Sequence, residues 1–163
     1  MLTSVVASDT GPLISLEKLE NGYEFMQKMY KQLIVPPAVL QELMSGTNLT
    51  PVDYSEKYQI HDFLHVVEPN KTFTYPKAYT LHAGEIQAIA LALEYESVLL
   101  IEEYAGRQVA KYLDIPFSGI AGQIMQAYRQ KHINILQAKA AWLRLKQTGR
   151  IGQNLYRKLL ETV

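Results

Sequence analysis

The sequence predicts an α/β fold in which a parallel β-sheet of four to five strands lies between layers of helices. Short apolar runs of strand length alternate with segments whose apolar residues recur at helical spacing, which is the pattern of βα units. The run 98–101 has no polar alternation, which is typical of a strand buried on both faces of a parallel sheet. Right-handed crossovers between such strands place helices on both faces and produce three layers.

The expected strands are apolar, β-favouring runs that stop at turn residues. In chain order these runs are 4–8, 33–35, 63–67 and 98–101. The first run ends at Asp9, where a cluster of turn and helix-start residues extends over 9–12. A further short segment, 115–117, separates two expected helices.

The expected helices have apolar residues three and four positions apart. They span 13–19, 23–30, 38–44, 83–94 and 104–113. Asn21-Gly22 separates the first two, and Pro36-Pro37 opens the third because proline is tolerated in the first helical turn. The helix 83–94 has the clearest periodicity of the set.

Two stretches, 45–60 and 68–80, have no clear period and are expected to be irregular, the first with a short helix. A helix is expected to start at 118–119. Two more helices are expected towards the end of the chain, with a break at 148–149.

Length and composition are those of one globular domain, with 163 residues, 48% of them hydrophobic and 20% charged. We expect a single domain over 1–163, in which 135–163 is a C-terminal helical extension. The apolar stretches are shorter than the roughly 18 to 20 residues of a membrane span, and the first residues lack the basic segment of a signal peptide. The absence of cysteine excludes disulfides and thiolate metal sites and fits a reducing compartment, so we expect a cytoplasmic protein.

The formal net charge of zero hides an uneven distribution. Residues 1–106 carry 14 acidic and 6 basic side chains, whereas residues 107–163 carry 2 acidic and 10 basic ones. A metal-dependent nuclease needs carboxylates for cations and basic residues for a phosphate backbone. Solvated basic helices explain the same distribution equally well.

Five acidic residues are candidates for chemistry. Asp9 and the pair Glu102-Glu103 directly follow strands, and ligands of open parallel sheets bind beyond the carboxyl ends of strands. Taken alone, a helix cap explains Asp9 better than a metal site does, and a solvated loop explains the pair equally well. Glu85 lies in a first helical turn, where the helix dipole already favours a carboxylate, and Glu42 fits the solvated side of its helix.

Four stretches of the chain together resemble PIN-like proteins of the DUF3368 family. They are SDTGPLI at 8–14, VPPAVLQE at 35–42, AGEIQAIA at 83–90 and LLIEEYAGR at 99–107. The resemblance continues through SGIAG at 118–122 to GRIGQNLY at 149–156, so it covers nearly the whole chain.

This resemblance implies a PIN-like fold whose acidic cluster binds Mg²⁺ or Mn²⁺ and hydrolyses RNA phosphodiester bonds, as in ribonuclease toxins of bacterial toxin-antitoxin pairs. The implied catalytic residues are Asp9, Glu42, Glu85 and Glu103, and the implied metal ligands are these four with Glu102. The family commonly has aspartates where this chain has Glu102 and Glu103. RNA, an antitoxin protein and a second copy of the chain are the implied partners.

The expected substrate-binding residues are Thr10, Arg107, Ser118 and Gly119. Arg107 follows Glu103 by four residues, so its guanidinium can bind a scissile phosphate or form a salt bridge with Glu103. Ser118-Gly119 places an N-cap serine at a helix start, which suits either an anion or simple capping.

The histidines do not cluster along the chain, and no glycine-rich nucleotide motif is present, so neither a zinc site nor a nucleotide site is expected. Tyr104 lies beside the acid pair in the sequence and would suit stacking on an RNA base. Two other hypotheses stay open. One is a catalytically weak PIN-like module that binds nucleic acid or a partner protein, and the other is a structural or oligomerising domain whose acids are scattered in space.

Overall fold

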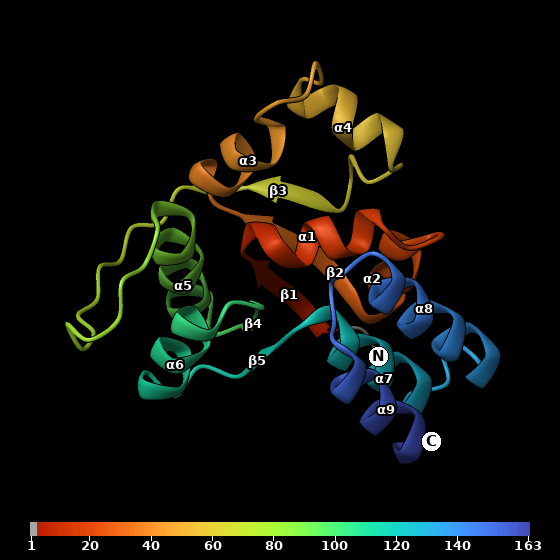
Figure 1. Ribbon diagram of the computed structural model, residues 1–163. Helices are drawn as coiled ribbons and strands as arrows, with labels where there is room; N and C mark the ends of the chain where they lie inside the picture. Colours follow the sequence, from red (N-terminus) through yellow and green to blue (C-terminus); the bar gives the residue numbers. More distant parts are fainter. Residues whose placement is uncertain (1–2) are drawn as a thin grey trace.

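A computed structural model describes residues 3–163 of the chain. In this part, five strands form one parallel sheet in the order β3-β2-β1-β4-β5 (Figure 1). The strands are β1 (Thr3–Ser8), β2 (Tyr30–Val35), β3 (Leu64–Val66), β4 (Val98–Leu100) and β5 (Phe117–Ser118). The predicted α/β fold with a parallel sheet of four to five strands is confirmed.

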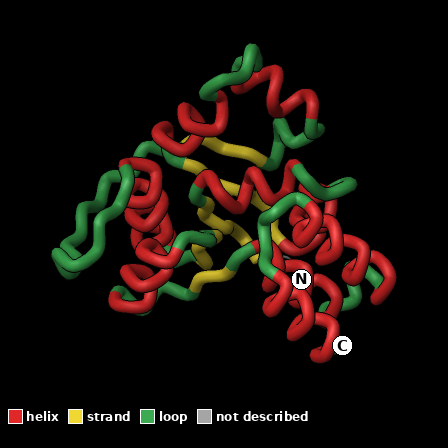
Figure 2. Tube along the Cα trace, viewed as in Figure 1, coloured by secondary structure: helices red, strands yellow, loops and turns green. Residues whose placement is uncertain are grey.

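Both faces of this sheet are covered by helices. Val6 and Ala7 are neighbours in β1 and therefore point to opposite faces, yet each has 0% exposure. Leu99 and Leu100 in β4 show the same burial. Figure 2 shows the strands in yellow in the middle of the molecule, with red helices around them. The apolar run predicted as a doubly buried strand therefore has the expected environment.

Residues 3–163 contain nine α-helices, whose ends agree with the expected helices to within a few residues. They are α1 (Thr10–Glu17), α2 (Gly22–Met29), α3 (Pro37–Met44), α4 (Pro51–Lys57), α5 (Ala83–Tyr95), α6 (Tyr104–Tyr112), α7 (Ile120–Arg129), α8 (Ile135–Gln147) and α9 (Gln153–Thr162). The break between α1 and α2 falls at Asn21, whose φ of 55° lies in the left-handed region that asparagine tolerates. None of the helices in this part of the chain combines the length and the apolar character that crossing a membrane requires.

The C-terminal helices pack in sequence against the rest of the fold. Helix α7 contacts α1, α2 and β5, α8 contacts α7, and α9 contacts α8 (Figure 1). Trp142 of α8 is fully buried, and its indole N–H donates a hydrogen bond of 3.1 Å to the carbonyl of Ala121 in α7. Trp142 and Leu159 belong to the same cluster of buried residues as the sheet.

The direction in which strands are added to the sheet reverses at β1. The chain runs outward from β1 through β2 to β3 on one side, and then adds β4 and β5 on the other. Open α/β sheets bind ligands at such a reversal, beyond the carboxyl ends of the strands. There the ends of β1 and β4 are joined by a hydrogen bond of 3.0 Å from the Asp9 amide to the Leu100 carbonyl. Asp9 and the pair Glu102-Glu103 therefore follow the two strands at the reversal.

Candidate metal centre

Two buried carboxylates lie at the reversal point of the sheet. Asp9 follows the central strand β1 and is 5% exposed, and Glu85 lies in the first turn of α5 and is 3% exposed. Asp9 occupies the N-cap position of α1, but its side chain makes no capping hydrogen bond. A helix cap therefore does not account for a buried aspartate at this position.

Two exposed carboxylates, those of Glu42 on α3 and Glu103 at the N-cap of α6, lie beside the buried pair. The surroundings of Gly84 show that the Glu42 and Asp9 carboxylates lie close together. A Cβ atom at Gly84 would lie 3.2 Å from Oε2 of Glu42 and 3.5 Å from Oδ1 of Asp9. Carboxylates from β1 and α3 thus meet over the first turn of α5, where a glycine leaves them room.

The electrostatics of Asp9 and Glu85 show that the four acids act on one another. Burial raises the pKa of Asp9 to about 7; the Thr10 amide opposes the rise, and the Glu85, Glu42 and Glu103 carboxylates add to it. Burial is also the main cause that raises the pKa of Glu85, with Glu103 and Glu42 contributing in the same direction. The structure thus brings Asp9, Glu42, Glu85 and Glu103 together. The hypothesis that these acids are scattered is wrong.

Two buried oxygen atoms of this site have no hydrogen-bond partner in the described part of the chain. They are Oε2 of Glu85 and the hydroxyl oxygen of Thr10. The other oxygen of Glu85 accepts a hydrogen bond of 3.0 Å from the His82 amide. An unsatisfied buried polar atom costs about 1 to 3 kcal/mol, and more when it is charged. Unpartnered oxygen atoms beside several carboxylates fit a hard divalent cation, which binds through oxygen.

The carboxylate of Glu102 is directed elsewhere. Its Oε1 accepts hydrogen bonds from the Ser15 hydroxyl at 2.8 Å and from Nη2 of Arg150 at 3.2 Å. Its Oε2 accepts one of 3.1 Å from the Ile120 amide. The structure does not bring Glu102 into the acidic cluster, contrary to its expected place among the metal ligands, because consecutive residues leaving a strand point to opposite sides.

The expected substrate-binding residues have other contacts. Arg107 donates through Nε to the Ile101 carbonyl at 3.1 Å, its guanidinium lies 5.5 Å from the Phe117 ring centroid, and within residues 3–163 it forms no ion pair with Glu103. The expectation that Ser118 caps a helix is wrong. Ser118 is the last residue of β5, its hydroxyl donates to the Gly119 carbonyl at 2.8 Å, and Gly119 itself is the N-cap of α7.

Comparison with known proteins identifies the family to which this fold and its acidic cluster belong. The model of the DUF3368 family, described as a PIN domain, matches residues 5–163. The chain belongs to the DUF3368 family of PIN domains. A solved PilT N-terminus domain protein, SSO1118 from the hyperthermophilic archaeon Sulfolobus solfataricus P2, superimposes with a TM-score of 0.54 at 17% identity, over 77% of this chain and 93% of that one. No curated protein sequence matches the chain. The PIN fold is a nuclease-type fold, and PIN domains generally use divalent metal ions.

One residue of this PIN domain's acidic site, His82, was not expected from the sequence. It is the N-cap of α5, and one ligand atom from each of His82, Glu85 and Glu103 lies within 4.8 Å of the others. The histidines do not cluster along the chain, so a search for neighbouring histidines does not find it. The available signal was the spacing of His82 and Glu85, three residues apart across a helix start, which brings an N-cap and an N3 side chain together.

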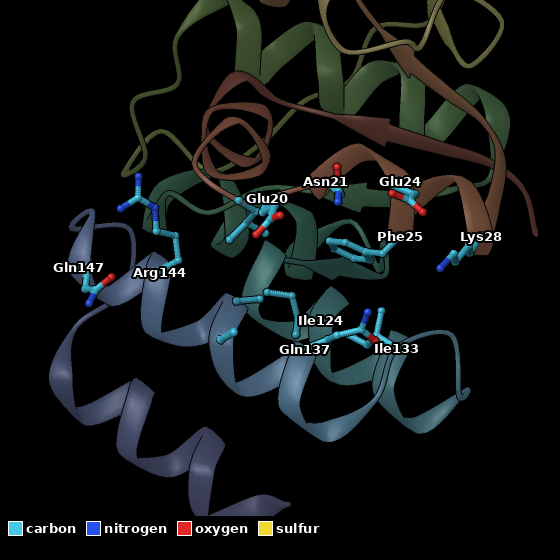
Figure 3. Close-up of a pocket in the computed structure, with 13 residues that line it drawn as sticks. Glu20, Asn21, Glu24, Phe25, Lys28, Ile124, Ile133, Gln137, Arg144 and Gln147 are labelled. Carbon is cyan, nitrogen blue, oxygen red and sulfur yellow. The ribbon is translucent and has the colours of Figure 1, made fainter.

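The cavity in Figure 3 is separate from the acidic site of the PIN domain. That cavity has a volume of about 540 Å³ and lies between α2, α7 and α8. Phe25 and Ile124 contribute apolar side chains to it, and Glu20 and Arg144 contribute charged ones (Figure 3). None of the four clustered acids lines it.

Proposed function

We propose that this PIN domain is a divalent-metal-dependent endoribonuclease. The observation that carries the proposal is the convergence of Asp9, Glu42, Glu85 and Glu103, one of whose buried oxygen atoms, Oε2 of Glu85, has no hydrogen-bond partner within residues 3–163. Four carboxylates from four separate elements repel one another, and this repulsion is costly unless a cation offsets it. Membership of a nuclease-type family supports the same chemistry.

Each acid has its own place in the proposed centre. Asp9 and Glu85 would hold the cation from the buried side, and Glu42 and Glu103 would hold it from the exposed rim. Bound there, Mg²⁺ or Mn²⁺ supplies positive charge that polarises a water molecule and stabilises the developing charge on phosphate oxygens. The protein contributes a preformed, partly buried set of oxygen donors, so no side chain is required as a nucleophile.

Residues around the acids are suited to an RNA strand. Tyr104 immediately follows Glu103 and is 72% exposed, so its ring is available to stack on an unpaired base. The Thr10 hydroxyl follows Asp9 and has no hydrogen-bond partner within residues 3–163, but it is buried, so it would reach a phosphate oxygen only after a local rearrangement. Among the expected substrate contacts, Arg107 donates to the Ile101 carbonyl through Nε, which leaves the other guanidinium nitrogen atoms for a phosphate.

The test is cleavage of single-stranded RNA by the purified chain in Mn²⁺ or Mg²⁺, with EDTA as the metal-free control. Asp9→Asn and Glu42→Gln should each reduce the rate at least about 100-fold, since loss of outer-shell partners alone costs 10- to 100-fold. Glu96→Gln is the matched control, because Glu96 is exposed and lies at the opposite end of α5 from Glu85. Cleavage that survives Asp9→Asn contradicts the proposal. RNA binding without cleavage by the metal-loaded chain would favour the binding-module hypothesis.

The family resemblance also suggests a cellular role for the proposed nuclease. We place the chain in the cytoplasm as the toxin of a toxin-antitoxin pair, with an antitoxin protein and a second copy of the chain as protein partners. Expression of the chain should then arrest growth, whereas Asp9→Asn expressed to the same level should not. Equal growth of the two strains contradicts the toxin assignment and leaves the ribonuclease assignment to be decided by cleavage.

A further inference from the structure

His82 gives the acidic site a nitrogen atom that faces two of its carboxylates. One ligand atom each from His82, Glu85 and Glu103 lies within 4.8 Å of the other two. His82 is the N-cap of α5 and Glu103 is the N-cap of α6, and these two helices contact each other. The three side chains therefore come from two helix starts, where the backbone is held in place by the helices that follow.

Glu85 independently indicates that a ligand belongs at this point. Its side chain is 3% exposed, and its Oε2 atom has no hydrogen-bond partner within residues 3–163. Burial is the main cause that raises its pKa; the Glu103 and Glu42 carboxylates act in the same direction, and the His82 amide and side chain oppose them. An anionic oxygen in this environment lacks a full positive partner, and a cation shared with His82 and Glu103 would supply one.

The chemistry of the donors indicates which cation fits. Mg²⁺ takes oxygen ligands and keeps several waters, so a histidine nitrogen contributes little to its affinity. Imidazole suits first-row ions such as Fe²⁺, Ni²⁺ and Zn²⁺, whereas carboxylates suit both Mg²⁺ and the first-row ion Mn²⁺. Mn²⁺ accepts both donors of this mixed group.

We infer that His82 is a nitrogen ligand of the metal centre, acting with Glu85 and Glu103, and that it makes the centre selective for Mn²⁺ or another first-row transition ion over Mg²⁺. This inference rests on the proposed metal-dependent function and adds to it a ligand and a metal preference. His82 is exposed at the rim, so it can rotate towards a bound ion without disturbing the core.

The direct test is pulsed electron paramagnetic resonance of the full chain loaded with Mn²⁺. The wild-type spin echo should show modulation from a coordinated imidazole nitrogen, and His82→Asn should abolish it. Asparagine is among the best N-cap residues, so this variant should retain or slightly raise the stability of α5. His61→Gln is the matched control, because the His61 side chain is 73% exposed and pairs with Asp62.

Titration calorimetry provides a second readout. His82→Asn should weaken Mn²⁺ binding by about tenfold or more and Mg²⁺ binding by less than about twofold, because only the transition ion uses the nitrogen. Bound Mn²⁺ without nitrogen modulation, or equal losses for the two ions, overturns the inference and leaves the proposed nuclease intact. A wild-type chain that binds no Mn²⁺ overturns both. Thermal unfolding without metal shows whether each variant is folded.

Discussion

Arg150, in the turn between α8 and α9, donates a hydrogen bond of 3.2 Å through Nη2 to Oε1 of Glu102. The same guanidinium donates to the Ser15 hydroxyl at 2.9 Å and to the Gly11 carbonyl at 3.0 Å. These contacts join the C-terminal turn to α1 and to the loop after β4. Glu102 therefore links the loop after β4 to Arg150, Ser15 and Ile120, and the two adjacent glutamates have different surroundings.

Glu102→Gln should therefore reduce mainly the stability of the fold, whereas Glu103→Gln should reduce mainly the affinity for Mn²⁺. Glu102→Gln weakens hydrogen bonds to a charged guanidinium and should lower the free energy of unfolding by about 2 kcal/mol, while Mn²⁺ affinity changes little. Glu103→Gln removes like-charge repulsion on Asp9 and Glu85 and should leave stability unchanged or higher, while Mn²⁺ affinity falls. Urea unfolding and titration calorimetry measure the two quantities. Equal losses of Mn²⁺ affinity in both variants would restore Glu102 to the metal ligands.

Local sequence patterns were sufficient to predict most of the fold. Strands and helices follow from apolar runs and periodicity, which are properties of short segments. The family resemblance also identified the acids that the fold brings together. Residues 117–118 form a strand too short for any periodicity, which is why the helix after it was placed to begin at Ser118.

The finer arrangement of the site was not predictable because it depends on residues distant in sequence. The Glu102 side chain is held away from the acidic cluster by its hydrogen bond with Arg150, which lies 48 residues further along the chain. His82 joins the site because α5 and α6 start beside each other. Patterns along the chain do not reveal such approaches, whereas the alternating direction of side chains after a strand indicates that only one of two adjacent glutamates can face a given site.

The stability of the metal-free chain should fall as pH rises from about 4 to about 7. The pKa of Asp9 is raised from 3.8 to about 7, mainly by burial, so across this window the folded chain holds a proton that the unfolded chain has lost. Each such proton changes the free energy of unfolding by about 1.4 kcal/mol per pH unit, and the raised pKa of Glu85 acts in the same direction. The comparison is urea unfolding in EDTA at several pH values.

Asp9→Asn is the control for this pH effect, because the amide does not titrate. Its unfolding free energy should exceed that of the wild type by an amount that grows up to about pH 7 and then levels. A difference that stays constant across this range would show that Asp9 ionises in the folded chain at its ordinary pKa. Mn²⁺ should reverse the trend in the wild type, since ligand carboxylates must be deprotonated and metal affinity therefore rises with pH.

Gly84→Ala should separate stability from metal binding. A Cβ atom at Gly84 would lie 3.2 Å from Oε2 of Glu42 and 3.4 Å from Val39, so both neighbours must move slightly. The methyl group would occupy space between Glu42 and Asp9, and we expect Mn²⁺ affinity to fall by roughly tenfold, comparable with the effect of disturbing outer-shell partners. Alanine in a helix is favoured over glycine by about 1 kcal/mol, so the metal-free chain should be no less stable.

The control for Gly84→Ala is Gly152→Ala. Gly152 has no atom within 4 Å of its would-be Cβ and lies at the start of α9. Calorimetry should find its Mn²⁺ affinity equal to that of the wild type. If Gly84→Ala also leaves the affinity unchanged, Glu42 and Asp9 do not bind the same ion.

Gly106→Ala should damage both the core and the site, because Gly106 of α6 is where the helix packs most closely on Ile101 and Glu85. A Cβ atom there would collide with Cδ1 of Ile101 and lie 2.8 Å from Oε2 of Glu85. Ile101 is fully buried, so overpacking should lower the free energy of unfolding by about 1 to 3 kcal/mol. Displacement of Glu85 should also lower Mn²⁺ affinity.

A second substitution distinguishes the two collisions. Ile101→Val removes the colliding Cδ1 atom, so the double variant Ile101→Val/Gly106→Ala should be more stable than Gly106→Ala, although Ile101→Val alone costs about 1 kcal/mol. Mn²⁺ affinity should not recover, because the methyl group still faces Oε2 of Glu85. If stability and affinity recovered together, Glu85 would be displaced by the shifted packing around Ile101 and not by direct contact with the new methyl group on α6. Urea unfolding and calorimetry of the two single variants and the double variant complete the cycle.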